Sequence, residues 1–246
     1  MINKEGNVYT FGFAIVMVIV VATLLSIAAM SLKPMQQKNE QQEKMQAVLK
    51  TIGVKCTREE AELQFNDFVK KRLLLNFEAV VKSEESGEID PLNKQDAFNI
   101  DIKKEFKNSA LGPENRNYPL YVCEKEGASY YVIPMVGKGL WGPIWGFMAI
   151  SEDMNTVSGA SFDHKTETPG LGAEIRYEPF QDQFPGEKIF DNNGKFVSIK
   201  VIKGGADKSD EHGVDAITGG TITSNGVTEM IERTLKVYAP YLRKPN

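Results

Sequence analysis

The sequence is poor in the residues that build disulfide frameworks and metal sites. Its 246 residues include only two cysteines and two histidines. Cys56 and Cys123 exclude a multi-bridge disulfide scaffold and a four-thiolate metal centre, although the sequence leaves open whether they pair. His164 and His212 are far apart and form no helical pair four residues apart. We therefore predict no metal ligand set.

The chain also lacks a block of like charge and the usual catalytic motifs. Its net charge is −4, with no long basic or acidic run, which argues against nucleic acid as a partner. No Ser-His-Asp order or zinc motif is present. Residues 137–142 match G-x-G-x-x-G, but strand-like sequence follows where a dinucleotide loop needs a helix. We interpret this segment as a tight bend between strands.

One long apolar run stands near the N-terminus. Residues 11–32 read FGFAIVMVIVVATLLSIAAMSL and contain no charge. At 1.5 Å per residue they span roughly 33 Å, enough to cross a hydrocarbon core of about 30 Å. A cleaved signal peptide has a shorter apolar region, of about 7–15 residues, and an Ala-x-Ala site that is missing here. We predict an uncleaved anchor within residues 1–34, whose flanking lysines do not decide its orientation.

Residues 35–72 carry two helical patterns. The first is polar with an apolar stripe and stops at Gly53. The second begins at a capping-box pattern, Thr57 to Glu60. We predict a helical stalk followed by a first domain helix, with both stripes in a core: Met45, Val48, Leu49 and Ile52 in the first, and Ala61, Phe65, Phe68 and Val69 in the second.

Residues 73–246 are predicted to form a domain rich in strands. A hairpin is the clearest element, with strands at 120–123 and 130–136 around a Glu-Lys-Glu-Gly turn. Strands cluster in the sequence and helices stand mainly at its ends, which favours an α+β fold with a largely antiparallel sheet. The other predicted strands are residues 73–81, 98–102, 144–150, 156–162 and 196–203.

The most informative stretch is residues 215–224, DAITGGTITS. We predict a helix at 225–239, with Ser224 as its N-cap and Pro240 at its end. Thr223 then precedes a helix N-terminus, where free N–H groups and the helix dipole favour an anion. Gly219 and Gly220 let the backbone approach a bulky group. The alternative is an ordinary capped turn. The helix carries an apolar stripe formed by Val227, Met230, Ile231, Leu235 and Tyr238.

This stretch resembles the flavinylation motif Ser/Thr-Gly-Ala-Thr-x-Thr/Ser. The motif belongs to the FMN-binding domains of two related proteins, the C subunit of sodium-translocating NADH:quinone reductase and the G subunit of Rnf complexes. Gly220 stands where the motif usually has alanine. The resemblance implies FMN joined to Thr223 through a phosphoester, with Thr221, Ser224 and the two glycines beside it.

Two further segments resemble the same family. Residues 168–172, Thr-Pro-Gly-Leu-Gly, match a turn that lines the flavin in the family. A turn of this kind exposes backbone donors and acceptors, which suit the edge of an isoalloxazine ring. The resemblance therefore implies flavin contacts from Thr168, Gly170, Leu171 and Gly172. Residues 139–142 resemble a Gly-Leu-Trp-Gly region, and Trp141 is expected in the core or beside the flavin.

The resemblance covers nearly the whole chain and is nearest to the C subunit of the reductase. It implies an electron-transfer flavoprotein coupled to Na⁺ export and anchored in the bacterial inner membrane, with the flavin domain outside the cytoplasm. It also implies as partners an FMN-bearing B subunit, membrane subunits with an iron–sulfur centre, and a flavin transferase for maturation. The G subunit of an Rnf-type complex and a tethered binding module without redox function remain alternatives.

Overall fold

The computed structural model describes residues 6–243, and contacts divide the chain into two units, Met1–Lys44 and Met45–Asn246. In the first unit the described residues are almost entirely helical, as part of α1 (Asn7–Thr51). This helix includes the predicted apolar run, whose side chains are exposed, and it is long and apolar enough to cross a membrane. Exposed apolar side chains over that length are what a lipid environment requires.

The second unit is built on a six-stranded antiparallel sheet, so the predicted α+β class is confirmed. The sheet order is β2-β1-β3-β4-β5-β6, and every neighbouring pair is antiparallel. Its strands are β1 (Val69–Leu75), β2 (Val81–Glu85), β3 (Tyr118–Lys125), β4 (Ala128–Lys138), β5 (Pro143–Ile150) and β6 (Val157–His164).

The predicted hairpin is the pair β3–β4. Lys125 lies opposite Ala128, which leaves Glu126 and Gly127 as a two-residue loop. Both loop residues have positive φ, 54° and 83°, as a type I′ turn requires. Glycine carries the larger value at no steric cost, and this turn fixes the register of the sheet.

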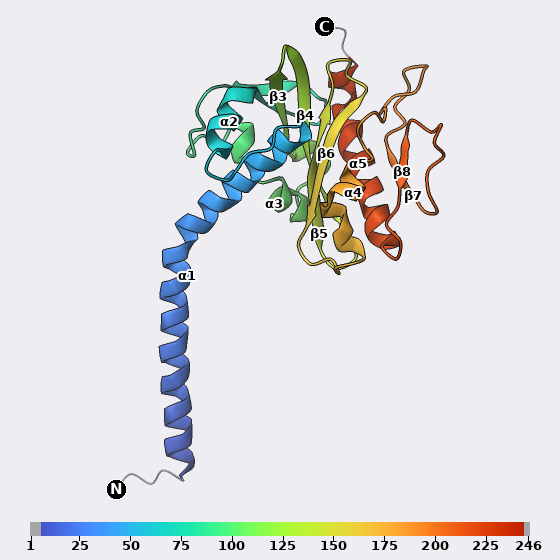
Figure 1. Ribbon diagram of the computed structural model, residues 1–246. Coiled ribbons are helices and arrows are strands. Elements are labelled where there is room, and N and C mark those ends of the chain that lie inside the picture. The colour runs from blue at the N-terminus through green and yellow to red at the C-terminus, as the bar shows by residue number, and fades with distance from the viewer. Residues whose placement is uncertain (1–5, 244–246) are drawn as a thin grey trace. The chain divides into compact units, whose positions relative to one another are not determined.

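Helices cover both faces of this sheet (Figure 1). On one face lies α5 (Thr221–Leu242), with the parallel pair β7 (Lys200–Ile202) and β8 (Gly213–Asp215) beyond it. On the other lie α2 (Ala61–Phe68) and the end of α1 from Met45 onward. The remaining short helices are η1 (Ala97–Asn99), α3 (Ile102–Lys107), η2 (Pro113–Asn115), η3 (Gly172–Arg176) and α4 (Glu178–Gln181).

Side chains of β4 alternate between the two cores. Tyr131, Ile133 and Met135 join the core beneath α5, whereas Val132 joins the core beneath α1 and α2. This is the two-residue period of a strand, and burial on both faces explains why its sequence is a continuous apolar run. The predicted apolar stripe of α5 and the stripe from Met45 to Ile52 are both buried as expected.

Three predicted strands are wrong or shortened. The strand predicted at 196–203 is reduced to the three residues of β7. The other two change because side chains bind the backbone locally. Residues 98–102 form η1 and the start of α3, since the carboxylates of Asp96 and Asp101 accept bonds from the N–H groups of Phe98 and Lys104. Such caps favour helical turns over strands. The run at 73–81 breaks after Leu75, where the Asn76 side chain accepts from two backbone N–H groups.

The boundaries of α5 also correct the prediction. The helix begins at Thr221 with Gly220 as the N-cap residue, four residues earlier than expected. The Ser224 hydroxyl does not cap it; instead it accepts a bond of 3.2 Å from the N–H of Ile217. Pro240 lies inside the helix. Because proline has no N–H, the carbonyl of Lys236 lacks its usual donor. Lys236 and Pro240 are both exposed, so that carbonyl faces solvent and the proline is tolerated.

A buried ion pair holds the loop between β2 and η1 against the sheet. Arg72 and Asp96 are each 1% exposed, and their side chains are joined by three N–H···O contacts of 2.8–3.0 Å. The same guanidinium donates to the carbonyl of Gly87. Removal of Asp96 would break all three of these contacts and would leave the buried Arg72 charge without a counter-ion.

We expect Asp96→Ala to lower the free energy of unfolding by about 3–5 kcal/mol, because it leaves the Arg72 charge buried and unpaired. The measurement is urea unfolding followed by tryptophan fluorescence, since Trp141 and Trp145 both lie in the second unit. The matched control is Lys71→Ala, which removes the exposed 2.9 Å pair with Glu84 and should change little. Equal midpoints for the two variants would contradict the role given to Asp96.

Candidate functional site

The first turn of α5 carries a buried threonine whose hydroxyl is bound to a carboxylate. Thr223 is the third residue of the helix and is 1% exposed. Its Oγ1 donates a hydrogen bond of 2.5 Å to Oε2 of Glu167, a residue 56 positions earlier in the chain. A bond this short between a hydroxyl and a carboxylate is typical of a charge-assisted contact.

Glu167 is itself buried, with 5% of its surface exposed. The Oε1 atom of Glu167 accepts a bond of 2.8 Å from the backbone N–H of Trp141. The backbone N–H of Glu167 donates to Nδ1 of His164 at 3.2 Å. Within residues 6–243 no lysine, arginine or histidine forms an ion pair with it. Glutamates are almost never fully buried unless they are paired, so the partners of Glu167 in this site are the hydroxyl of Thr223 and the backbone N–H of Trp141.

Two glycines make room for this pair on either side. A Cβ at Gly172 would overlap with Thr223 Oγ1 and would lie 2.5 Å from Glu167 Oε2. A Cβ at Gly139 would lie 2.6 Å from Glu167 Oε1. Real Cβ atoms do not approach oxygen so closely. The backbone at Gly139 and at Gly172 can therefore lie this near the Glu167 carboxylate only because glycine has no side chain.

The turn at residues 168–172 and the glycines ahead of α5 are in contact. The Thr168 carbonyl accepts bonds of 3.1 Å from the N–H groups of Leu171 and Ala173. Gly170 has a φ of 76°, and its N–H donates to Oε1 of Glu174 at 2.8 Å. A Cβ at Gly219 would lie 2.6 Å from Cδ2 of Leu171. The two stretches singled out in the sequence therefore form one site.

The start of α5 presents donors suited to an anion. The first backbone bond into the helix runs from Ser224 N to Gly220 O, at 2.9 Å. The N–H groups of Thr221, Ile222 and Thr223 come before it, so the helix itself offers them no acceptor. Free N–H groups and the positive end of the helix dipole favour a phosphate or carboxylate here.

Exposed apolar side chains adjoin the buried pair. Each is next to a site residue in the sequence: Leu171 beside Gly172, Ile222 beside Thr223, and Leu140 beside Gly139. Their exposed fractions are 41%, 57% and 46%, and Trp141, whose N–H holds Glu167, is 66% exposed. Exposed apolar side chains next to buried polar groups suit the binding of a partly apolar molecule.

The structure brings some of the predicted site residues together and gives others different roles. Gly172 lies against the Thr223 hydroxyl, and Gly219 lies against the Leu171 side chain. Gly220 packs against Ile217 and the backbone of Gly172, and the Thr221 side chain is half-buried at the first helical position.

Two predicted site residues contribute in another way. The Ser224 hydroxyl faces Ile217, and the Thr168 side chain is exposed, so its backbone carbonyl is the group that shapes the turn. Glu167 and Gly139 were not predicted as site residues. The only sequence signal for Glu167 is its place directly before the Thr-Pro-Gly turn.

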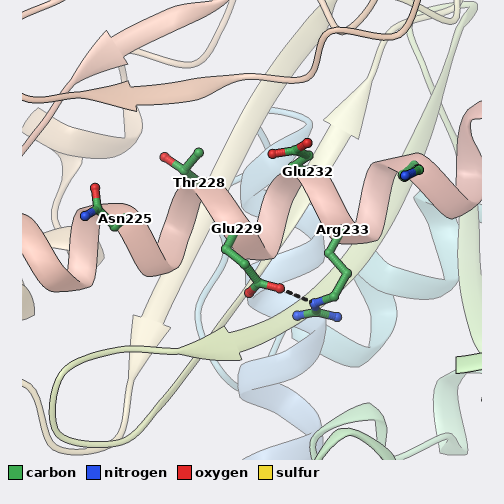
Figure 2. Close-up of a pocket in the computed structure, with 6 residues that line it drawn as sticks. Asn225, Thr228, Glu229, Glu232 and Arg233 are labelled. Carbon is green, nitrogen blue, oxygen red and sulfur yellow. Dashed lines mark hydrogen bonds and ion pairs between the residues drawn. The ribbon is translucent and has the colours of Figure 1, made fainter. Parts of the chain in front are cut away.

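A hollow elsewhere on α5 is not part of this site. It is lined by polar side chains that extend to both sides of the helix (Figure 2). Glu229 and Arg233 are joined by an ion pair of 2.6 Å and lie on one side, away from Asn225, Thr228 and Glu232. Thr223 and Glu167 do not line it. Its side chains do not converge on a common point, as those of a binding site do.

Comparison with known proteins identifies the family. Residues 139–236, which contain both the turn and the start of α5, match the family described as FMN-binding domain. The C subunit of the Na⁺-translocating NADH-quinone reductase of Vibrio alginolyticus is 31% identical over 98% of this chain and 96% of its own length. The corresponding protein of Neisseria meningitidis serogroup B is 32% identical with the same coverage. The chain belongs to the C-subunit family of Na⁺-translocating NADH-quinone reductases.

Solved structures of this family share the fold. The C subunit from Parabacteroides distasonis superposes with a TM-score of 0.75 at 36% identity, covering 87% of this chain and 98% of that one. NqrC of Shewanella oneidensis gives a TM-score of 0.67 at 26% identity, covering 83% and 98%. The resemblance drawn from the sequence motifs is thus confirmed, and the family is one of oxidoreductase-complex subunits.

We expect Gly172→Ala to lower the free energy of unfolding by about 1–3 kcal/mol, because its Cβ forces Thr223 and Glu167 apart. The cost should be smaller in a Thr223→Ala background, where Oγ1 is gone, with a coupling of more than about 0.5 kcal/mol. The measurement is a double-mutant cycle by urea unfolding. If the two substitutions change the free energy of unfolding additively, the effect of Gly172→Ala does not arise from its contact with Thr223.

Proposed function

We propose that the protein is the membrane-anchored, electron-carrying C subunit of a Na⁺-translocating NADH:quinone reductase, with FMN joined to Thr223 through a phosphoester. The observation that carries this proposal is the Thr223 hydroxyl, held by a buried carboxylate in the first turn of a helix. Membership of the family and the FMN-binding domain match support the same conclusion.

The residues around Thr223 fit an FMN phosphate. The N–H groups of residues 221–223 point out of the helix N-terminus, where they stabilise a phosphate by about 0.3–1 kcal/mol through the dipole alone. Gly219 and Gly220 leave no side chains between that phosphate and the backbone. A phosphoester at Thr223 also prevents loss of the flavin into an extracytoplasmic space.

The exposed apolar group next to the site fits the ring system. Leu171 and Ile222 offer apolar surface, and Trp141 offers an aromatic face. The carbonyl and N–H groups of residues 168–172 supply acceptors and donors for the polar edge of an isoalloxazine. FMN supplies electron transfer when bound, whereas these residues hold it, exclude water from its linkage and set its surroundings.

Attachment requires a local movement. Thr223 is 1% exposed and lies beneath the backbone of Gly172, so a phosphate on Oγ1 cannot be added without displacing that turn or rotating the side chain. The turn is suited to such a displacement because Thr168, Pro169, Gly170 and Leu171 are exposed. We infer that it opens when the flavin is attached.

The N-terminal helix and the family indicate a single-pass membrane anchor. We propose that residues 1–34 cross the bacterial inner membrane, that 35–72 supply the stalk, the first domain helix and the start of β1, and that 73–246 form the rest of the flavin domain outside the cytoplasm. There the flavin would pass electrons between an iron–sulfur centre of membrane subunits and the FMN of the B subunit, coupled to Na⁺ export. A flavin transferase would act during maturation.

We expect Thr223→Val to abolish covalent flavin and Thr223→Ser to retain it. Valine has nearly the shape of threonine but no hydroxyl, whereas serine keeps the nucleophile. The measurement is fluorescence of the denatured gel band after co-expression with the flavin transferase, with mass spectrometry of the peptide that contains residue 223. A fluorescent band from the valine variant would place the attachment at another residue.

We expect Asn192→Cys to be labelled by a membrane-impermeant maleimide in intact spheroplasts, because Asn192 is exposed in the second unit. The native thiols give little background, since burial raises the pKa of Cys123 to about 12 and also raises that of Cys56. The control is Asn7→Cys, at the start of α1, which should be labelled only after permeabilisation. The reverse pattern would place the domain in the cytoplasm.

A further inference from the structure

We propose that Glu167 is the base for flavin attachment, accepting the proton of Thr223 Oγ1 as that oxygen attacks phosphorus. This inference rests on the proposed attachment at Thr223. It follows from the 2.5 Å bond that the hydroxyl donates to Glu167 Oε2, which already aligns the proton with its acceptor. A general base has to lie within this range of the proton it removes.

The carboxylate is fixed in position before any donor molecule arrives. The N–H of Trp141 holds Oε1 at 2.8 Å, so Oε2 is the oxygen left to face Thr223. Gly139 and Gly172 enclose the carboxylate on two sides. A side chain confined in this way cannot rotate freely, and confinement keeps base and nucleophile aligned.

Among residues 6–243 the neighbouring ionisable groups other than Glu167 form no hydrogen bond with the Thr223 hydroxyl. His164 Nδ1 accepts the backbone N–H of Glu167, whereas its buried Nε2 has no hydrogen-bond partner in this part of the chain. The Glu174 carboxylate accepts the N–H of Gly170 and stabilises the turn. Glu167 is the carboxylate that the structure places on the reacting hydroxyl.

The step balances with a flavin dinucleotide as the donor. An FMN monoester has no good leaving group, so the flavin phosphate has to arrive in a phosphoanhydride. The Thr223 O–H bond breaks and its proton passes to Glu167 Oε2, while a new Oγ1–P bond forms. The P–O bond of the anhydride breaks, and the nucleoside monophosphate leaves with its electron pair. Nothing is oxidised or reduced.

The lack of a cation paired with Glu167 among residues 6–243 agrees with this role. A lysine or arginine bound to the carboxylate would compete with the Thr223 hydroxyl for its oxygens.

The test is the rate of flavin attachment to the full-length protein in detergent, with purified flavin transferase and flavin adenine dinucleotide. Glu167→Gln keeps the size and an acceptor for Trp141 N–H but cannot take a proton. We expect it to be labelled at least about 100-fold more slowly at saturating protein, with little change in half-saturation, because a general base contributes about 10²–10⁴-fold. Glu152→Gln, at an exposed position between β5 and β6 and outside the site, is the matched control, and its rate should stay near that of the native protein.

A second variant guards against a merely structural effect. Glu167→Ala leaves space for a small carboxylate, and formate should restore labelling in proportion to its concentration, whereas chloride should not. Native-rate labelling of Glu167→Gln, or no rescue of Glu167→Ala by formate, would overturn the role of Glu167 and leave attachment at Thr223 intact. Native protein that stays unlabelled, with an unmodified Thr223 peptide, would overturn both proposals.

Discussion

The candidate site depends on one hydrogen bond between a buried hydroxyl and a buried carboxylate. The bond from Thr223 to Glu167 joins the first turn of α5 to the segment that follows β6. Both groups are removed from water, so each needs the other as a partner. In the proposed attachment reaction the same bond aligns the hydroxyl proton with a base. On that proposal, stability of the unmodified chain and its readiness for modification come from the same contact.

The sheet brings the two partners together by letting α5 approach closely. A Cβ at Gly226 would overlap with the carbonyl oxygen of Lys138, and one at Gly137 would lie 2.7 Å from Cβ of Met230. Glycine at both positions allows the helix to lie directly on the end of β4. On the far side of α5, the Thr228 hydroxyl accepts the N–H of Val201 in β7. The helix is thus held from two sides, and Thr223 cannot move along its axis.

This rigidity contrasts with the turn that covers the hydroxyl. Residues 168–171 are exposed, and their backbone bonds are made mostly within the turn itself. Segments with few buried contacts open at low free-energy cost. The proposed modification thus needs movement only in the covering turn, while the nucleophile, its base and the anion-binding helix end stay in place. Such a division suits an attachment site that must open once during maturation and stay closed around its flavin afterwards.

The sequence by itself determined the long apolar helix near the N-terminus, the hairpin at Glu126–Gly127, the apolar stripe of α5 and the two motifs that resemble a flavin-binding family. These depend on spacing within a few residues, where local rules hold. The strand at residues 98–102 was predicted incorrectly because single side-chain caps, those of Asp96 and Asp101, decide that segment. The start of α5 was also predicted incorrectly, because the Ser224 hydroxyl binds Ile217 and does not cap the helix. Glu167 could not be predicted as the partner of Thr223, since 56 residues separate them. Only the tertiary structure buries that carboxylate against the hydroxyl, because burial depends on the packing of the sheet, the turn and the helix together.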